Sequence, residues 1–207
     1  MNNLTQFRSS SAQLLLVAAL GCCAQGAPAG ADATAFTPRQ SDLAVAAAAH
    51  KFGDEGTRRV SALAGGYVDG DTNSGALMSL GASWFFLDGL AISALAEGMI
   101  GDASGTSTGG AGAAVEVEWH FVRHERWSAF LYAGCGFLAS TEAIPAGGTT
   151  FNSTPRAGVG MTFQPDQSAD WRLVFMCGWY HISNARTSSD NPGMNAIEAM
   201  VGVSIGF

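Results

Sequence analysis

The feature that most constrains the fold of this chain is an alternation of apolar and polar side chains at every second residue. Residues 115–121 place Val, Val, Trp and Phe at the odd positions, with Glu116, Glu118 and His120 between them. Residues 197–207 alternate in the same way, with mostly small or polar residues at the even positions. Because successive side chains of a β-strand point to opposite faces, both stretches predict strands with one apolar and one polar face.

The alternation recurs from residue 58 to the end of the chain and favours strands over helices throughout. Residues that are common in turns, namely Gly, Asp, Asn, Pro and Ser, separate segments of about the length that a tilted strand needs to cross a membrane. These eight segments are 58–68, 76–86, 89–100, 111–121, 127–139, 156–163, 171–184 and 195–207. An even number of antiparallel strands can close into a barrel without free edges.

A soluble β-sandwich would show the same alternation, so the connections have to distinguish the two folds. If both ends of the barrel lie on the periplasmic side, the periplasmic connections are 87–88, 122–126 and 164–170. The external connections are then 69–75, 101–110, 140–155 and 185–194. The external set is longer and richer in Gly, Ser and Thr, which is typical of outer-membrane barrels.

We therefore predict an all-β fold, an eight-stranded antiparallel transmembrane β-barrel of the outer-membrane type. Phe207, which ends an amphipathic last segment, resembles the terminal assembly signal of bacterial outer-membrane proteins. Side chains fill the interior of so small a barrel, which argues against a porin.

Charged residues indicate what fills the interior and which partners are excluded. Arg172 and His120 are predicted to pair in the lumen with acidic residues at inward positions, so that no isolated charge is buried there. These acidic residues are Glu97, Glu116, Glu118 and Glu198. A net charge of −7 and a single lysine, Lys51, argue against a nucleic-acid partner, because binding phosphates needs clustered Lys and Arg.

The first 31 residues have the layout of a secretory signal peptide. Arg8 precedes a short apolar run at 14–20, and small residues follow. Cleavage between Ala24 and Ala31 and lipidation of Cys22 are both compatible with this layout. Residues 32–57 are predicted to form a linker or lead segment and 58–207 the barrel, which places the protein in the outer membrane of a Gram-negative-type bacterium.

The candidate chemistry lies on either side of the last connection. His181 and Ser183 are two residues apart on a predicted strand, so their side chains share a face, and that face is otherwise apolar. Asn195 begins the final strand with the same orientation as the outward Ile197. The three polar groups are therefore expected to meet at the outer-leaflet end of the wall, where polar groups are costly unless they contact headgroups or do work.

A histidine and a serine on one face can act together in ester cleavage. A neutral imidazole can take the serine proton, which makes Ser183 a candidate nucleophile and His181 a candidate general base and acid. The reaction also needs donors for the oxyanion, and Asn184, Asn191 or a backbone N–H of the 185–193 loop can supply them. A third group normally orients the histidine.

This region resembles the lipid A 3-O-deacylase (PagL-type) family of outer-membrane barrels, in which a His-x-Ser-Asn-Ala motif precedes a loop with Asn and Gly and then the final strand. The matching residues are His181, Ser183, Asn184, Ala185, Asn191 and Gly193. The resemblance implies a serine esterase that removes the 3-O-linked acyl chain of lipid A, the lipid anchor of lipopolysaccharide. It implies no metal and no cofactor, since the serine itself is the nucleophile.

One position departs from the family pattern. The family places a glutamate two residues after the loop glycine to orient the histidine, whereas this chain has Asn195. An amide oxygen can accept the imidazole N–H, but it brings no charge to stabilise the imidazolium. Glu198 is predicted to face the interior, whereas Asp190 lies in the loop and could reach the histidine. We favour Asn195 over both for the orienting role. Arg186 is a second departure, at a position where a smaller residue is expected.

Two other functions are compatible with the sequence. One is a non-catalytic structural or adhesive barrel, in which Asn195 marks the loss of catalysis. The other is a related phospholipase that acts on glycerophospholipid. The expected partners are lipid A or lipopolysaccharide and the outer membrane itself, and the sequence leaves the oligomeric state undetermined.

Overall fold

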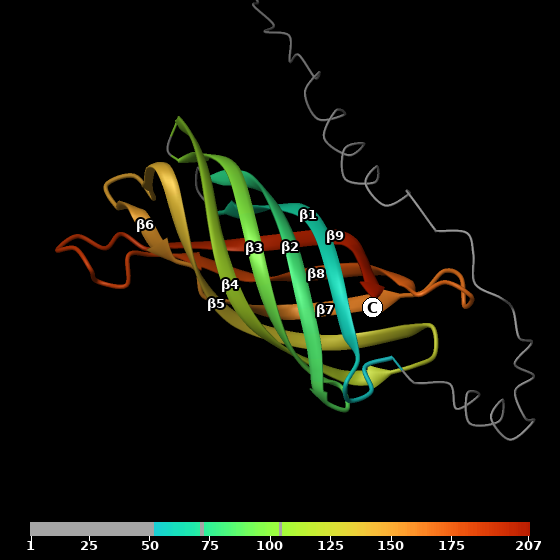
Figure 1. Ribbon diagram of the computed structural model, residues 1–207. Helices are drawn as coiled ribbons and strands as arrows, with labels where there is room; N and C mark the ends of the chain where they lie inside the picture. The colour runs from blue at the N-terminus through green and yellow to red at the C-terminus, as the bar shows by residue number, and fades with distance from the viewer. Residues whose placement is uncertain (1–51, 71–72, 104) are drawn as a thin grey trace, which may run out of the picture. The chain divides into compact units, whose positions relative to one another are not determined.

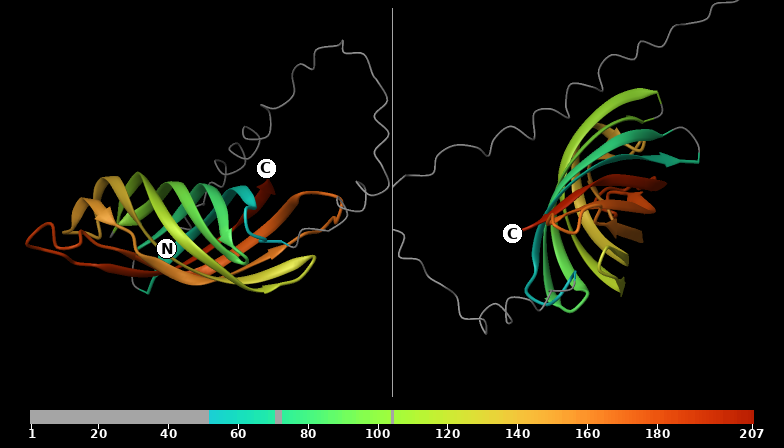
Figure 2. Two further views of the ribbon diagram at one scale, coloured as in Figure 1. Left: turned by 60° about the horizontal axis from the view of Figure 1, so that its bottom comes forward. Right: turned by 90° about the vertical axis from the view of Figure 1, so that its right-hand side faces the viewer.

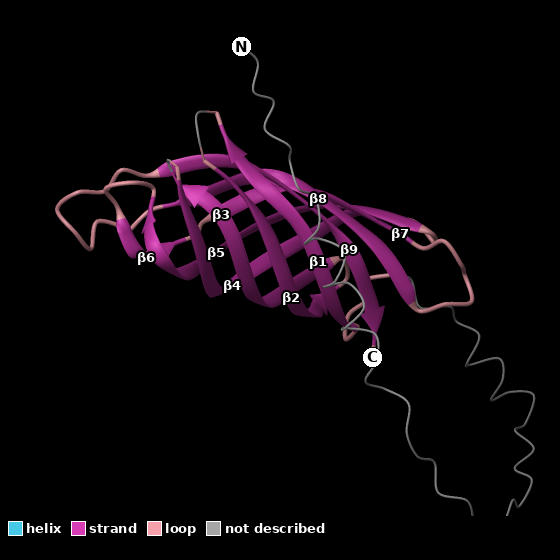
Figure 3. Ribbon diagram, turned by 90° about the horizontal axis from the view of Figure 1, so that it is seen from above, coloured by secondary structure: helices cyan, strands magenta, loops and turns pink. Residues whose placement is uncertain are grey.

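The computed structural model describes residues 52–70, 73–103 and 105–207. The predicted signal peptide at 1–31 and most of the lead segment at 32–57 lie outside these residues and stay predictions. Within the described part of the chain, no helix is long and apolar enough to cross a membrane. The described residues form strands and the turns and loops that join them (Figure 3).

The described part of the chain forms nine strands, each antiparallel to its neighbours (Figure 1). They are β1 (Arg58–Asp69), β2 (Ser74–Leu87), β3 (Leu90–Ala103), β4 (Thr106–Arg123), β5 (Trp127–Ile144), β6 (Thr149–Ser153), β7 (Arg156–Phe163), β8 (Trp171–Ile182) and β9 (Met194–Gly206). The end of the barrel with Arg58 and Phe207 is called the terminal rim below, and the end where β8 stops and β9 starts is called the site rim.

The nine strands fill eight places in a closed wall. The sheet runs β4-β3-β2-β1-β9-β8-β7-β5, and pairing of β4 with β5 closes it. Strands β6 and β7 share one place, because β7 pairs with residues 127–134 of β5 and β6 pairs with residues further along the same strand. The predicted eight-stranded antiparallel barrel is therefore confirmed.

The main difference from the predicted connections concerns 140–155, which we expected to be an external loop. Strand β5 instead continues to Ile144, and β6 returns from Thr149, so that only 145–148 form a turn. The two halves of this segment bond to each other and form a hairpin at the site rim. Figures 1 and 2 show this hairpin projecting from the same end of the barrel as the β8–β9 loop.

The outer surface is apolar and the interior is polar, which is the reverse of a soluble protein. Outward side chains remain well exposed, with 66% for Leu80, 71% for Ile100 and 64% for Ile197. Interior positions hold charged groups instead, and Glu116 and Glu198 are each only 2% exposed. An apolar band around a polar lumen is the pattern of a barrel that spans a membrane.

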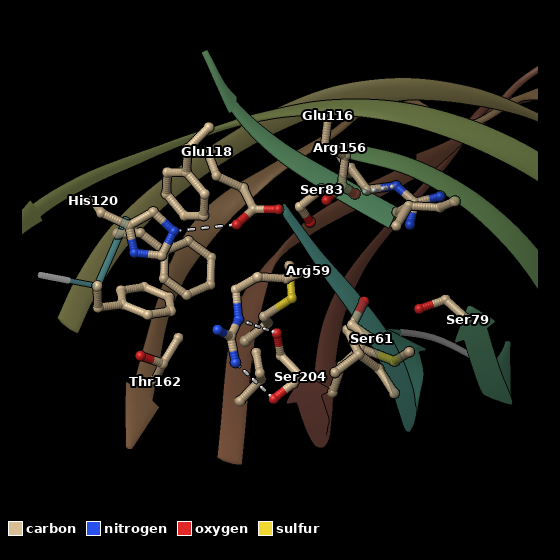
Figure 4. Close-up of a pocket in the computed structure, with 18 of the residues that line it drawn as sticks. Arg59, Ser61, Ser79, Ser83, Glu116, Glu118, His120, Arg156, Thr162 and Ser204 are labelled. Carbon is tan, nitrogen blue, oxygen red and sulfur yellow. Dashed lines mark hydrogen bonds and ion pairs between the residues drawn. The ribbon is translucent and has the colours of Figure 1, made fainter. Parts of the chain in front are cut away.

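Ion pairs hold the interior together, with one partner that the sequence analysis missed (Figure 4). Arg156 binds both carboxylate oxygens of Glu97. Its Nε lies 3.5 Å from Oε1 of Glu116, which Figure 4 labels beside it. His120 pairs with Glu118 at 3.2 Å, as expected. These contacts compensate charges that would otherwise be costly to bury.

Arg172 does not pair with the interior glutamates, so that part of the prediction is wrong. It lies near the start of β8 at the terminal rim, and it donates to the backbone oxygen of Glu125 at 2.7 Å and to Gln164 Oε1 at 2.9 Å. The alternation along the strand correctly predicted that Arg172 faces the interior. It did not predict the position of Arg172 along the barrel axis, which decides which interior groups it can reach.

The lumen has no room for an aqueous channel. Its cavity measures about 50 Å³ and is lined by residues that include Arg59, Ser61 and Glu118 (Figure 4). That volume holds a few water molecules. Near the terminal rim, the ring of Phe52 packs against Phe85 and His120 and contributes to the lining of the same cavity.

Candidate active site

The candidate residues gather on the outer face of the barrel at the site rim. Strands β8 and β9 are antiparallel neighbours, and their register places His181 directly opposite Asn195. Both side chains are on the outward face, as the exposed Trp179 and Ile197 of the next pair are. The two-residue periodicity of the strands therefore brings together polar groups that are 14 residues apart in the sequence.

The pairing of His181 with Asn195 determines which imidazole nitrogen carries the proton. His181 Nδ1 lies 3.0 Å from Asn195 Oδ1. An amide oxygen only accepts hydrogen bonds, so Nδ1 has to donate. A neutral imidazole has one N–H, and its other nitrogen, Nε2, is then left free to accept a proton.

Ser183 follows β8 directly and is held by the strand on its other side. It forms an isolated bridge with Ser153, with backbone hydrogen bonds of 2.7 and 3.1 Å in the two directions. The Ser153 hydroxyl donates to the backbone oxygen of Ser183 at 3.0 Å and lies 3.5 Å from Ser183 Oγ. Ser183 is 8% exposed and makes no hydrogen bond with His181 among the described residues. Such contacts often tighten only when a substrate binds.

Gly193 borders both members of the pair. A Cβ at this position would lie 2.8 Å from His181 Cε1, 3.3 Å from Nε2 and 3.7 Å from the Cβ of Ser183. The free Nε2 edge of the imidazole and the Ser183 side chain therefore face a common space beside Gly193. This arrangement suits transfer of a proton between a hydroxyl and an imidazole once Ser183 Oγ turns towards it.

The two predicted oxyanion donors, Asn184 and Asn191, differ in whether their side-chain N–H groups already form hydrogen bonds within the loop. Asn184 is 3% exposed, its Nδ2 donates to the backbone oxygen of Asp190 at 2.6 Å, and its Oδ1 accepts from the backbone N–H of Arg186 at 2.9 Å. Asn191 is an exposed residue that accepts from the Asn184 backbone N–H at 3.1 Å, and its Nδ2 donates to none of the described residues. Asn184 therefore shapes the loop, and Asn191 has the donors available for a ligand.

The backbone is strained where the loop leaves the motif. Ala185 and Arg186 have φ values of +50° and +63°, in the left-handed region that glycine prefers. Arg186 thus occupies a position that favours glycine, which gives a geometric reason for the smaller residue expected there. Thr187 stabilises the turn, because both its backbone N–H and its hydroxyl donate to the backbone oxygen of Asn184.

The other two acids considered for orienting the histidine lie elsewhere. Glu198 points into the lumen and accepts a hydrogen bond from Tyr132 at 2.9 Å. Asp190 contributes its backbone oxygen to the loop through Asn184. Among the described residues, Asn195 is the side chain that bonds to the His181 imidazole.

Two neighbours of the site were not singled out from the sequence. Trp179 shares the parity of His181, and its indole N–H donates to Asn195 Oδ1 at 2.9 Å. Ser153 lies in a stretch that was predicted to be a loop, so no register for it was available. Trp179 could have been found from its two-residue spacing to His181. Ser153 could be found only once the path of β6 was known.

The fold and the site together define an outer-membrane β-barrel with a histidine, serine and asparagine cluster on its membrane-facing surface. The lipid A 3-O-deacylase (PagL) family matches residues 66–204, and the chain belongs to this family. It is a family of ester hydrolases, and membership indicates an outer-membrane location.

Solved structures resemble the barrel at low sequence identity. The outer membrane enzyme PagL has a TM-score of 0.53 at 19% identity, and the match covers 71% of this chain and 98% of that one. OprG from Pseudomonas aeruginosa matches with a TM-score of 0.47 at 8% identity, covering 76% and 97% of the two chains. Ail from Yersinia pestis matches at 0.41 and 15% identity, covering 74% and 99%. No curated protein sequence matches the chain. The likeness to the PagL structure concerns the fold.

Proposed function

We propose that this protein is a serine esterase that hydrolyses the 3-O-linked acyl ester of lipid A from within the outer leaflet. The observation that carries the proposal is the hydrogen bond between His181 Nδ1 and Asn195 Oδ1, which leaves Nε2 free beside Ser183 on the outward face. The family supports lipid A as the substrate, since its members are lipid A 3-O-deacylases.

In the proposed reaction, Ser183 Oγ attacks the carbonyl carbon of the ester while His181 Nε2 takes the hydroxyl proton. The electron pair of the C=O bond moves onto its oxygen, and the oxyanion accepts hydrogen bonds from Asn191 Nδ2. When the intermediate collapses, the sugar oxygen leaves with the proton from His181. Water, activated by the same nitrogen, then cleaves the acyl-serine and releases the fatty acid.

Asn195 supports this cycle less strongly than a glutamate would. Its oxygen holds the imidazole in the productive tautomer, but it is neutral and does not offset the positive charge that His181 acquires in the transition state. We therefore expect this protein to turn over more slowly than family members with a glutamate at this position.

The proposed substrate also fits the surroundings of the site. The face that carries His181 continues along β8 with Trp179, Cys177 and Phe175, all of them exposed and facing outwards. A lipid in the surrounding leaflet can place its acyl chains on this apolar wall and its ester group at the rim. A water-soluble ester would gain nothing from such a surface.

The test is mass spectrometry of lipid A incubated with purified, refolded protein. Wild-type protein is expected to release the 3-hydroxy fatty acid, and Ser183→Ala is expected to release none while still showing the heat-modifiable mobility of a folded barrel. Ser140→Ala is a matched control, since its hydroxyl donates to a backbone oxygen in the β5–β6 hairpin without contacting Ser183. Full activity in Ser183→Ala would overturn the assignment of Ser183 as the nucleophile.

A non-catalytic barrel is the second candidate, favoured by Asn195 at the position of the family glutamate. It predicts that the wild-type protein hydrolyses neither lipid A nor glycerophospholipid. The same incubation with both lipids distinguishes this outcome from a phospholipase, which would release fatty acid from the glycerophospholipid alone.

A further inference from the structure

Trp179 is bonded to the group that orients the histidine. Its indole Nε1–H donates to Asn195 Oδ1 at 2.9 Å, and the same oxygen lies 3.0 Å from His181 Nδ1. The Trp179 ring also stacks on the His181 ring, with centroids 5.5 Å apart and an angle of 23° between the planes. One amide oxygen thus receives two N–H donors from side chains of the same strand.

This tryptophan stands apart from the others in the chain. Pairing places the remaining four near the terminal rim, opposite strand-end residues: Trp84 with Arg58, Trp119 with Leu90, Trp127 with Phe163 and Trp171 with Ile205. Tryptophans at one height suit the interfacial belt of a membrane protein. Trp179 lies near the other rim, where its N–H has a specific partner within the site.

An asparagine needs such a partner because the two ends of its side-chain amide differ. The oxygen accepts hydrogen bonds and the nitrogen donates them, whereas both oxygens of a glutamate accept. If the Asn195 amide turned over, its N–H groups would face the indole N–H, and two donors would meet without an acceptor. The indole only donates, so it keeps the amide oxygen directed at the imidazole.

We propose that Trp179 is a positioning residue: its indole N–H orients the Asn195 amide and thereby selects the His181 tautomer in which Nε2 is free to accept a proton. With the amide turned over, Asn195 Nδ2 donates to Nδ1, the imidazole proton resides on Nε2, and His181 does not accept a proton from Ser183. The role in catalysis rests on the proposed function. Trp179 is needed in this role because residue 195 is an asparagine, whose two amide ends differ. A carboxylate at position 195 would not need it, since both of its oxygens accept.

A double-mutant cycle tests this dependence. Trp179→Phe removes the N–H and keeps an aromatic ring beside His181. Loss of one orienting hydrogen bond is expected to lower kcat on lipid A in detergent micelles about tenfold, with KM little changed. In an Asn195→Glu background, the same substitution is expected to change kcat less than about twofold. Equal losses in both backgrounds would overturn the proposal, because they would indicate a packing role only.

The tautomer itself gives a readout that does not depend on activity. In wild-type protein labelled with 15N-histidine, the His181 resonances are expected to report the Nδ1–H form, and in Trp179→Phe they are expected to shift towards the Nε2–H form. Trp119→Phe, which alters a half-exposed tryptophan at the terminal rim, is expected to leave both kcat and the tautomer unchanged. An unchanged tautomer in Trp179→Phe would refute the orienting role.

The two readouts separate this inference from the proposed function. If the wild-type protein releases no fatty acid and Trp179→Phe still shifts the tautomer, the esterase assignment fails and the orienting role of Trp179 stands. If the wild-type protein is active and Trp179→Phe changes neither rate nor tautomer, the esterase assignment stands and the orienting role fails.

Discussion

Gly193 leaves the edge of the His181 ring uncovered, so that a side chain at position 193 would begin 2.8 Å from Cε1 and 3.3 Å from Nε2. Gly193 is the last residue before β9, and a Cβ there would meet the ring edge of His181 that carries the free nitrogen. Because residue 193 has no side chain, the imidazole can occupy its observed position and its Nε2 edge is open towards Ser183.

Gly193→Ala is therefore expected to displace the imidazole and to lower kcat at least about tenfold, since small misplacements of reacting groups are costly. KM should change little, because the substituted position borders the dyad rather than the apolar wall. Gly70→Ala is the control, since a Cβ at that loop position meets no atom of the described residues within 4 Å. Steady-state kinetics on lipid A check this, and an undiminished kcat in Gly193→Ala would contradict the role given to the ring edge.

Asn195→Glu is expected to raise kcat about tenfold. The carboxylate keeps an acceptor at His181 Nδ1 and adds a negative charge beside the imidazolium that forms in the transition state, and bonds to charged groups are stronger than neutral ones. Asn195→Ala, which removes the acceptor, should lower kcat by at least the same factor. The measurement is the initial rate at saturating lipid A. A glutamate variant slower than the wild-type protein would show that a neutral partner suits this site better.

Ser153→Ala tests the support that β6 gives to the nucleophile. The Ser153 hydroxyl donates to the Ser183 backbone oxygen and lies within 3.5 Å of its Oγ, so its loss should leave Ser183 less well positioned. We expect kcat to fall about three- to tenfold, the value of one neutral hydrogen bond. Labelling of Ser183 by a fluorophosphonate probe should slow in parallel. Ser153→Thr should retain most of the activity, and equal losses in the alanine and threonine variants would rule out a role of the hydroxyl.

Arg156→Met tests the interior rather than the site. Without Arg156, Glu97 loses both of its hydrogen bonds and Glu116 loses its nearest cation. Removing one partner of a buried ion pair is expected to lower the free energy of unfolding by about 3 kcal/mol. Arg58→Ala, at an exposed position, should change it by less than about 0.5 kcal/mol. Urea titration of the refolded protein in lipid vesicles measures both, and an Arg156→Met variant as stable as the wild-type protein would contradict the stabilising role of these ion pairs.

The wall of the barrel could be predicted from the sequence because a strand has a period of two and one face must be apolar. That parity placed His181 and Asn195 on the same outward face and Glu198 inside, as they are in the structure. It could not give the height of a residue along the barrel axis. Arg172 was therefore paired with the wrong groups, and Arg156, which lies level with Glu116 across β5, was missed.

The details of the site depended on segments that periodicity does not describe. Ser153 reaches Ser183 because 140–155 folds into a hairpin, whereas Gly and Thr residues in this stretch indicated a loop. Gly193 was named from the family motif alone, and its steric role appears only when the imidazole is placed. Trp179 was not singled out, since a sequence does not show which acceptor an indole N–H finds.

The outward placement of His181 and Ser183 has a kinetic consequence. A lipid ester would reach them by lateral diffusion in the plane of the leaflet, without entering the lumen or leaving the membrane. The relevant concentration is then the number of substrate molecules per unit of membrane area. Diluting lipid A with inert lipid at constant bulk concentration should slow the reaction, whereas adding more vesicles of the same composition should leave the rate per bound enzyme molecule unchanged.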